Sequence, residues 1–310
     1  RARRRGRGGE RGGGGGVGRR MAVPVAGVGG GPAAGGAGAV GSQRGGGDDG
    51  GESFSVPEYQ PENVNAEPIP AEGEIRPDDE ATTESGTVLI DDAHGNRYAR
   101  ADIQPMVEAL TRVGYDVEFY TGGELSAELE DAKAFVVIDP ASEFRPGDID
   151  DIRRFTGQGG RLLMVGEPDR IAVGGGFFGA SIVNQESRLT TLASRYGMSV
   201  DTAYLYNQES ADANYKWITT RPGENADIEG VERTTMYTAA AVRTNGGRVL
   251  LRSAANTQRA DSDDAGRYPV AVRRGDVILL GDKSFMNDGR FRVADNEAFV
   301  TYLVEFLASG

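Results

Sequence analysis

The stretch TVLIDDAHGN, residues 87–96, sets the pattern from which the fold can be predicted. Its first four residues, Thr87–Ile90, form a short apolar run, and two aspartates end that run. The same pattern returns in FVVIDP, residues 135–140, and in GGRLLMVG, residues 159–166. Short apolar runs that end in turn or acidic residues are typical of strands buried on both faces of a sheet.

Apolar residues at helical spacing separate these strands. The first predicted helix begins near Asp102 and ends at Gly114, and the second is stopped by Gly157. The apolar stripes are Ile103, Met106, Val107, Leu110 and Val113, then Ile149, Ile152 and Phe155, and then Leu189, Leu192, Ala193 and Tyr196. Val117–Tyr120 is a further predicted strand. This alternation predicts a mostly parallel sheet with helices on both faces.

The pattern changes after residue 200. Two β-hairpins are predicted, one joining 236–243 to 248–253 and one joining 268–272 to 276–280. A final helix is indicated by the stripe Phe299, Tyr302, Leu303, Phe306 and Leu307. We therefore expect one α/β domain over residues 86–310, which ends in β-hairpins and a helix.

The residues before this domain differ in composition. Residues 1–51 contain 22 of the 47 glycines and few large apolar side chains, so we expect them to be disordered. Residues 52–85 are acidic and rich in proline, without periodicity, which is typical of an extended linker.

Three interpretations of residues 1–51 remain open. An Arg/Gly tail can bind nucleic acid, but this one lacks the interleaved aromatic residues that stack on bases. Arg19-Arg20 followed by the stretch 21–41 resembles a degraded twin-arginine export signal. Such a signal would place a tethered domain outside the cytoplasm. Without it, we expect a cytoplasmic protein. The third is an artefact of start-site choice or of a frame shift in GC-rich DNA. We favour the second or the third.

The charge distribution excludes several partners. The formal net charge is −13, but residues 1–47 hold nine arginines and one glutamate, so residues 48–310 carry about −21. A domain with this negative charge would repel nucleic acid and anionic membranes.

Only three of the 34 basic residues are lysine, and high Asp and Glu with little Lys is typical of salt-accumulating halophiles. No apolar run is long enough to predict a transmembrane helix.

Two residue types limit the possible chemistry. The chain has no cysteine, which excludes disulfides, thiolate metal sites and cysteine nucleophiles. His94 is the only histidine, and no G-x-S-x-G elbow occurs. We interpret His94 as a polar loop residue that shapes a crevice.

Polar residues follow the predicted strands at their carboxyl ends, where open parallel sheets bind ligands. The candidate crevice residues are Asp91, Asp92, His94, Asn96, Asp139, Gly166, Glu167, Asp282, Lys283 and Ser284. The carboxylates of Asp91, Asp92, Asp139 and Asp282 could form a binding site for Mg²⁺. The alternative is that these residues only cap the helices that follow them. A Lys283 ammonium beside Asp91 or Asp139 would neutralise the cluster without a metal, and we favour that outcome.

Three short motifs give weak signals. Gly174–Gly179 matches G-x-G-x-x-G but does not follow the first strand, so a loop with two exposed aromatic residues that forms a contact surface is favoured over a dinucleotide site. Asp261–Gly266 lacks the full ligand set of a calcium loop and is interpreted as an acidic hairpin loop. Arg274–Asp276 spells an adhesion tripeptide where a tight turn requires glycine.

Two resemblances arise from these motifs. Asp91-Asp92 with Asp139 resembles a phosphoacceptor receiver domain, but Gly166-Glu167 stands where receivers have Ser or Thr, and Lys283 comes too late. The stretches quoted above, with GDKSFMN at 281–287 and DNEAF at 295–299, resemble an uncharacterised family common in halophilic archaea. That family is similar to class I glutamine-amidotransferase-like domains, and its relatives include accessory proteins of gliding-motility-type ABC transporters and an intraflagellar-transport subunit.

The second resemblance implies a flavodoxin-like sheet in a domain that has lost its catalytic triad. We therefore predict a non-catalytic binding or assembly domain with a protein partner, accessory to a membrane transport or surface complex such as a set of transporter subunits. The alternative is an Mg²⁺-dependent hydrolase or phosphotransfer domain that uses the strand-end carboxylates.

Overall fold

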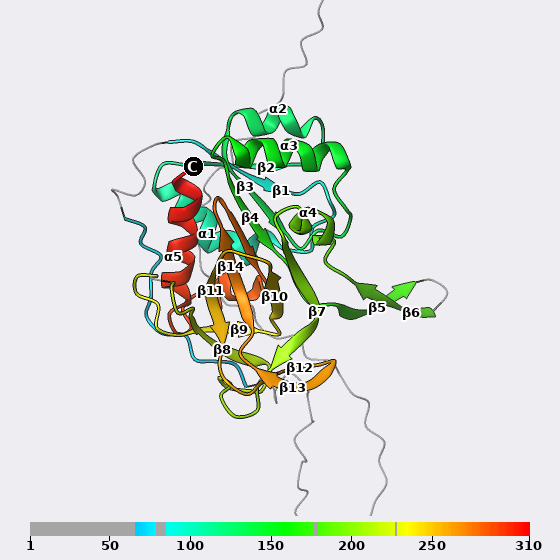
Figure 1. Ribbon diagram of the computed structural model, residues 1–310, viewed down its shortest axis with the longest axis vertical. Helices are drawn as coiled ribbons and strands as arrows, with labels where there is room; N and C mark the ends of the chain where they lie inside the picture. The colour runs from blue at the N-terminus through cyan, green and yellow to red at the C-terminus, as the bar shows by residue number, and fades with distance from the viewer. Residues whose placement is uncertain (1–65, 79–84, 177–178, 227) are drawn as a thin grey trace, which may run out of the picture. The chain divides into compact units, whose positions relative to one another are not determined.

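The computed structural model describes residues 66–78, 85–176, 179–226 and 228–310 (Figure 1). The helices are α1 (Arg100–Arg112), α2 (Leu125–Glu130), α3 (Pro146–Gly157), α4 (Thr190–Ser194), the 3₁₀ helix η2 (Ser284–Met286) and α5 (Asn296–Ala308). The strands are β1 (Thr87–Asp91), β2 (Asp116–Tyr120), β3 (Ala132–Ile138), β4 (Arg161–Val165), β5 (Arg170–Gly176), β6 (Gly179–Gln185), β7 (Met198–Tyr206), β8 (Trp217–Pro222), β9 (Thr234–Tyr237), β10 (Ala240–Thr244), β11 (Arg248–Ser253), β12 (Thr257–Arg259), β13 (Ser262–Gly266), β14 (Pro269–Arg274) and β15 (Val277–Leu280).

A nine-stranded sheet of mixed direction forms the centre of the domain. Its strand order is β2-β1-β3-β4-β15-β14-β11-β8-β9. The first five strands in this order are parallel, and the rest continue antiparallel. β1 pairs directly with β3, as the sequence predicted, so the strand order reverses between them. The carboxyl ends of β1, β3, β4 and β15 therefore meet at one edge.

The parallel strands bury alternate residues in two cores. On one face, Val88 and Ile90 of β1 pack in the same cluster as apolar residues of α1 and α5. On the other face, Leu89 packs with residues of α2, α3 and α4. Because side chains alternate along a strand, the wholly apolar runs noted in the sequence supply both cores. Helices α2 and α3 lie together above the sheet in Figure 1.

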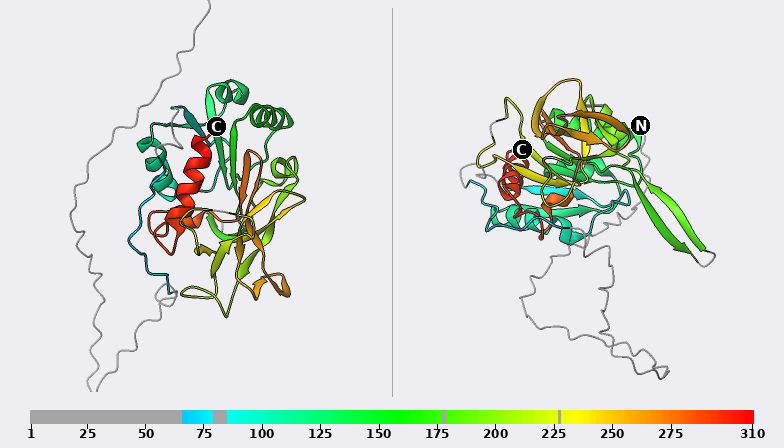
Figure 2. Two further views of the ribbon diagram at one scale, coloured as in Figure 1. Left: turned by 60° about the vertical axis from the view of Figure 1, so that its left-hand side comes forward. Right: turned by 90° about the horizontal axis from the view of Figure 1, so that it is seen from below.

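Two smaller sheets accompany the large one. β10, β7, β12 and β13 form a four-stranded sheet, and β5 and β6 form a two-stranded hairpin that extends away from the rest of the domain (Figures 1 and 2). The sequence indicated a loop at 174–179, but residues 174–176 belong to β5 and Gly179 begins β6. The two aromatic residues of the expected contact surface, 177 and 178, lie outside the described residues.

The expected fold class is confirmed in its coarser form, as a mixed α/β domain rich in sheet. The predicted hairpin of 268–272 with 276–280 is present as β14 and β15, with Gly275 in the left-handed region at φ 59°. The predicted hairpin of 236–243 with 248–253 is wrong. β10 pairs with β7, whereas β11 pairs with β14 and β8, so the two segments lie in different sheets. Asp261–Gly266, expected as a loop, contains strand β13.

Residues 66–78, which fall inside the predicted linker, are in contact with the domain. The Ile75 side chain is buried in the core cluster that contains α1 and α5. The backbone N–H of Ala71 donates to the Arg292 carbonyl at 2.7 Å, and Arg112 Nη1 donates to the Ile75 carbonyl at 2.9 Å. The part of the chain expected to be disordered, 1–51, lies outside the described residues.

Candidate functional site

The carboxyl ends of the parallel strands bring most of the predicted crevice residues to one edge of the sheet. Asp91 is the last residue of β1, Asp139 follows β3, Glu167 lies just beyond β4, and Lys283 lies just beyond β15. All four side chains are buried. They divide into an Asp91–His94 pair and a network of ion pairs around Lys283, which we call the strand-end network.

The Asp91–His94 pair fixes the loop after β1. The Nδ1 of His94 lies 2.8 Å from Asp91 Oδ1 and 3.0 Å from Oδ2, and it donates to the carboxylate because an ionised carboxylate only accepts. The His94 ring stacks on Phe144 with centroids 3.8 Å apart. The Ser142 hydroxyl donates to the His94 carbonyl oxygen at 3.1 Å, so it serves the loop backbone. These contacts make His94 a buried residue of the loop after β1, and its role in shaping a crevice stays a prediction.

Lys283 joins two carboxylates from neighbouring strand ends. Its Nζ lies 3.2 Å from Asp139 Oδ2 and 3.4 Å from Glu167 Oε1. Arg97 reaches Asp139 from the other side, with Nη2 2.6 Å from Oδ1. Buried charges are costly unless they are paired, and here each carboxylate has a cation on either side. The expected ion pair between Lys283 and Asp139 is therefore present.

Glu167 is a buried acid of the strand-end network with a raised pKa. Its pKa is about 7, because burial raises it most, the nearby Asp282 carboxylate adds to the rise, and Lys283 and Arg170 oppose it. Arg170, the first residue of β5, forms an ion pair with the Glu167 carboxylate. The backbone N–H of Lys283 donates to Glu167 Oε1 at 2.9 Å. The side chain thus links the ends of β4 and β15 to the start of the β5–β6 hairpin.

Asp282 and Ser284 shape the turn after β15. The Asp282 carboxylate is fully buried and accepts the Ser284 N–H at 2.8 Å and the Ser284 hydroxyl at 3.0 Å. It also accepts the Tyr237 N–H at 3.2 Å, which ties the turn to β9. The pKa of Asp282 is raised, because burial raises it more than the hydrogen bonds from Ser284 lower it. The carboxylate therefore acts as a backbone acceptor in this turn.

Three predicted crevice residues have other roles. Asp92 is exposed and forms an ion pair with Arg100 at 2.7 Å. The Asn96 amide donates to the Ile138 carbonyl at 2.9 Å and holds the loop against the end of β3. A Cβ on Gly166 would lie 2.7 Å from Val200 Cγ2, so glycine lets β7 approach the end of β4. Each of these contacts joins the residue to a neighbouring part of the fold.

The four carboxylates proposed for Mg²⁺ are not gathered into a metal site. Asp91 is bound to His94, Asp92 to Arg100, and Asp139 to Arg97 and Lys283, while Asp282 accepts backbone N–H groups. Among the described residues, no group of three or more His, Cys, Asp or Glu side chains could hold a metal ion. The alternative of a hydrolase or phosphotransfer centre built on these residues stays a prediction.

The sequence did not single out Arg97 and Arg170, the two arginines of the strand-end network. Arg97 also donates through Nη2 to the Glu186 carbonyl at 2.6 Å, directly after β6 ends. Arg170 starts β5, so the network reaches both ends of the β5–β6 hairpin. Arginine supplies 31 of the 34 basic residues, and a single arginine in such a chain carries no signal.

A cavity of about 270 Å³ adjoins this network on the side of α4 and β7. Glu167 and the backbone segment that follows β6 contribute to its wall. The lining residues are Glu143, Glu167, Asp169, Glu186, Ser187, Arg188, Thr190, Thr191, Val200, Asp201 and Thr202. The Ser187 hydroxyl oxygen is buried there without a hydrogen-bond partner. The charged residues that line this small cavity are five acids and Arg188, and Arg188 is paired to Glu186 at 3.0 Å.

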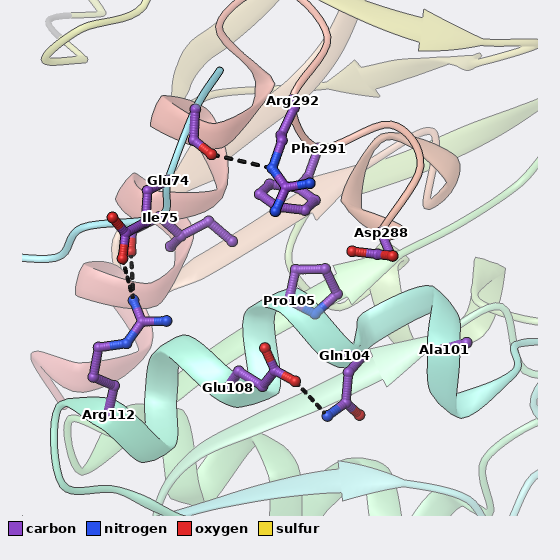
Figure 3. Close-up of a pocket in the computed structure, with 11 residues that line it drawn as sticks. Glu74, Ile75, Ala101, Gln104, Pro105, Glu108, Arg112, Asp288, Phe291 and Arg292 are labelled. Atoms are coloured by element: carbon purple, nitrogen blue, oxygen red, sulfur yellow. Dashed lines mark hydrogen bonds and ion pairs between the residues drawn. The ribbon is translucent and has the colours of Figure 1, made fainter. Parts of the chain in front are cut away.

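A larger cavity of about 730 Å³ lies away from the strand ends, between residues 73–75, α1 and the loop before α5 (Figure 3). Its charged side chains are largely engaged with one another or with backbone. Gln104 donates to Glu108 at 2.9 Å, and Arg292 Nε donates to the Gly73 carbonyl at 3.2 Å. Arg112 lies 3.7 Å from Glu74. These contacts secure the segment 73–75 on the domain.

The fold and the strand-end network define a mixed α/β domain whose strand-end charges are paired with each other. Residues 104–304 match the family described as a domain of unknown function, DUF4350, and the chain belongs to that family. The comparison with curated proteins found no match. None of the helices in the described ranges is long and apolar enough to cross a membrane.

Two solved structures are similar to this chain. One is the "mmIFT52 N-terminal domain", with a TM-score of 0.55 and 13% identity over 72% of this chain and 98% of that one. The other is a putative ThuA-like protein from Parabacteroides merdae, with a TM-score of 0.41 and 13% identity over 72% of this chain and 90% of that one. At this identity, the first likeness concerns the fold alone.

The comparisons correct the expected family. The sequence motifs suggested a haloarchaeal family with a glutamine-amidotransferase-like domain, and nothing in the comparisons indicates such a family. The stretch 87–96, which carried much of that resemblance, lies before the range that matches DUF4350. Short apolar strands that end in Asp or Gly occur in many α/β proteins, so these motifs are specific for strand ends and not for one family.

Proposed function

We propose that this chain is a binding or assembly domain that performs no catalysis at its strand ends and uses the β5–β6 hairpin as its contact part. The observation that carries the proposal is the strand-end network. In many open parallel sheets this edge binds a ligand, but here Lys283, Arg97 and Arg170 already neutralise the carboxylates. The strand ends therefore hold the domain together.

The network also holds the base of the hairpin. Arg170 joins the start of β5 to Glu167, and Arg97 joins the residue after β6 to Asp139. The N–H of Asp169 donates to the Thr202 carbonyl at 2.8 Å, which adds a backbone link to β7. Hydrogen bonds between charged groups are stronger than neutral ones and fix direction. A hairpin anchored in this way suits a contact element that must keep its orientation on the domain.

The strand order supports the finer description of the fold. The order β2-β1-β3-β4-β15 in the parallel half is that of a flavodoxin-like sheet. We infer that the antiparallel strands and the hairpin are additions to such a core, in keeping with a sheet that serves as a scaffold. The partner predicted from the sequence, a membrane transport or surface complex, stays a prediction.

The proposal is tested by separating the hairpin from the strand-end network. In one variant, residues 171–184 are replaced by a short turn, so that Arg170 and Glu186 remain. We expect this variant to keep the thermal midpoint of the parent protein but to lose any stoichiometric partner that co-purifies with the parent from its own cells. Loss of the fold in this variant would contradict the view of the hairpin as a separate contact element.

A second measurement addresses catalysis. The parent protein and Asp139→Asn are assayed for hydrolysis of phosphate and carboxylate esters, with and without Mg²⁺. We expect no turnover that depends on Asp139 and no rise in thermal midpoint on adding Mg²⁺. Mg²⁺-dependent turnover that disappears in a folded Asp139→Asn protein would overturn the non-catalytic proposal.

A further inference from the structure

The β5–β6 hairpin forms a two-stranded sheet of its own. Its seven residue pairs run from Arg170 with Gln185 to Gly176 with Gly179 without a bulge. In the right-hand view of Figure 2 it extends away from the nine-stranded sheet. A two-stranded ribbon has two free edges, each with unpaired N–H and C=O groups, and an isolated hairpin is only marginally stable in water.

The hairpin lacks the devices that protect free edges. Residues 171–184 contain no charged residue and no proline, in a chain where 26% of residues are charged. The side chain of Ile171 is 76% exposed and that of Val183 is 47% exposed. Proteins usually protect an exposed edge with lysine, proline or a bulge, and this hairpin has none of the three within 171–184. Its edges are therefore suited to pairing with another strand.

We propose that one free edge of this hairpin pairs with the same edge of the hairpin in a second copy of the chain, so that two hairpins form a four-stranded antiparallel sheet about a two-fold axis. The inference rests on the proposed role of the hairpin as the contact part. Antiparallel pairing of identical edges is self-complementary, which is the requirement for a closed dimer.

The charge distribution lets a second copy make contact through the hairpin and not through the body of the domain. Residues 48–310 carry about −21, so two copies repel each other wherever their bodies come close. The uncharged hairpin extends from the body and allows contact without bringing the two acidic surfaces together (Figure 1). The contact itself buries no charge, so the electrostatic interaction between two copies is the repulsion between their acidic surfaces. Salt screens this repulsion, and dimerisation should therefore strengthen with salt. A contact formed by opposite charges would weaken with salt.

The test measures the oligomeric state of the full chain by analytical ultracentrifugation, from nanomolar to high micromolar concentration, in dilute and in molar KCl. We expect a monomer–dimer equilibrium whose dissociation constant falls with salt. Ile171→Lys should raise that constant at least about tenfold, because it places a charge on the contact. Ile69→Lys is the matched control, since Ile69 is also exposed, at 90%, and lies away from the hairpin in sequence.

Single cysteines identify the edge, because the parent chain has none. Cysteine is introduced at each position of β5 and β6 in turn, and disulfide-linked dimers are quantified. Antiparallel pairing about a two-fold axis gives one maximum on one strand, with decreasing yield on both sides. A flat profile, or a dimer unaffected by Ile171→Lys, would overturn the inference.

A failure of this inference can be distinguished from a failure of the proposed function. If the chain stays monomeric at every concentration and salt level while a different protein binds in a hairpin-dependent way, the second copy is wrong and the contact role remains. If neither the second copy nor any other partner depends on residues 171–184, both are wrong.

Discussion

The ammonium of Lys283 lies 3.2 Å from the carboxylate of Asp139, although 144 positions separate the two residues in the chain. Asp139 lies at the end of β3 and Lys283 beyond the end of β15, with β4 between the two strands. The same ammonium is 3.4 Å from Glu167 beyond β4. One buried cation thus connects three strand ends, and Asp139 holds its place with φ 42°, in the left-handed region.

Removing this cation should destabilise the domain strongly. In Lys283→Met the side chain keeps much of the volume of the lysine methylene chain, but Asp139 and Glu167 each lose a buried cationic partner. We expect the free energy of unfolding to fall by about 3 kcal/mol, the usual scale for breaking a buried ion pair. Urea denaturation followed by circular dichroism measures the change. Lys216→Met is the control, since Lys216 is only half-buried and contacts the Tyr215 ring; an equal loss there would show that the effect is not specific.

The raised pKa of Glu167 should appear in the pH dependence of stability. Its pKa is about 7 in the folded chain against an ordinary value of 4.5, so the folded state binds more protons between these values. The contribution of this group to stability is complete below pH 4.5 and is lost as the pH rises through 7. We expect Glu167→Gln to flatten the fall of the thermal midpoint between pH 5 and pH 8.

The control for this pH experiment is Glu128→Gln in α2, the same substitution at an exposed carboxylate. Scanning calorimetry at several pH values between 5 and 8 compares the parent and the two variants. The interpretation fails if Glu167→Gln and the parent have parallel pH profiles, because Glu167 would then have an ordinary pKa.

Much of the strand-end network followed from the sequence. Apolar runs that end in Asp or Gly predicted β1, β3 and β4, and parallel strands must present their carboxyl ends at one edge. The pairing of Lys283 with Asp139 was predictable because Lys283 is one of three lysines and follows a strand end. Arg97 and Arg170 were not predictable, since their partners depend on loop geometry that no local pattern encodes.

The errors in the second half of the chain have a common physical cause. Residues 236–243 and 248–253 were predicted to form a hairpin around Asn245-Gly246-Gly247, yet β10 and β11 enter different sheets. Their partners, β7 and β14, lie elsewhere in the chain, and long-range packing overrides local turn preference. The β5–β6 hairpin was missed because a run of glycines weakens strand propensity.

Gly281, directly after β15, should not tolerate a side chain. A Cβ at this position would overlap the carbonyl oxygen of Ala240, and the N–H of Ala240 donates to the Gly281 carbonyl at 2.7 Å. Because the obstacle is backbone, the two segments would have to separate. We expect Gly281→Ala to lower the free energy of unfolding by about 2 kcal/mol, within the range for overpacking. Gly147→Ala in α3 is the control, because a Cβ there meets nothing within 4 Å; equal stability of the two variants would contradict the close approach.

Salt should stabilise the domain, because its acidic surface is self-repulsive. Residues 48–310 carry about −21, and this repulsion opposes the compact state until ions screen it over a few ångströms. We expect the thermal midpoint to rise between dilute buffer and molar KCl.

Changing the exposed Glu118, Glu128 and Glu130 to glutamine removes part of the repulsion. This triple variant should therefore have a higher thermal midpoint than the parent in dilute buffer and gain less from salt. Sucrose raises the midpoint by exclusion from the surface and should affect both proteins equally. A midpoint that is independent of KCl, or a triple variant that gains as much as the parent, would mean that the acidic surface does not limit stability.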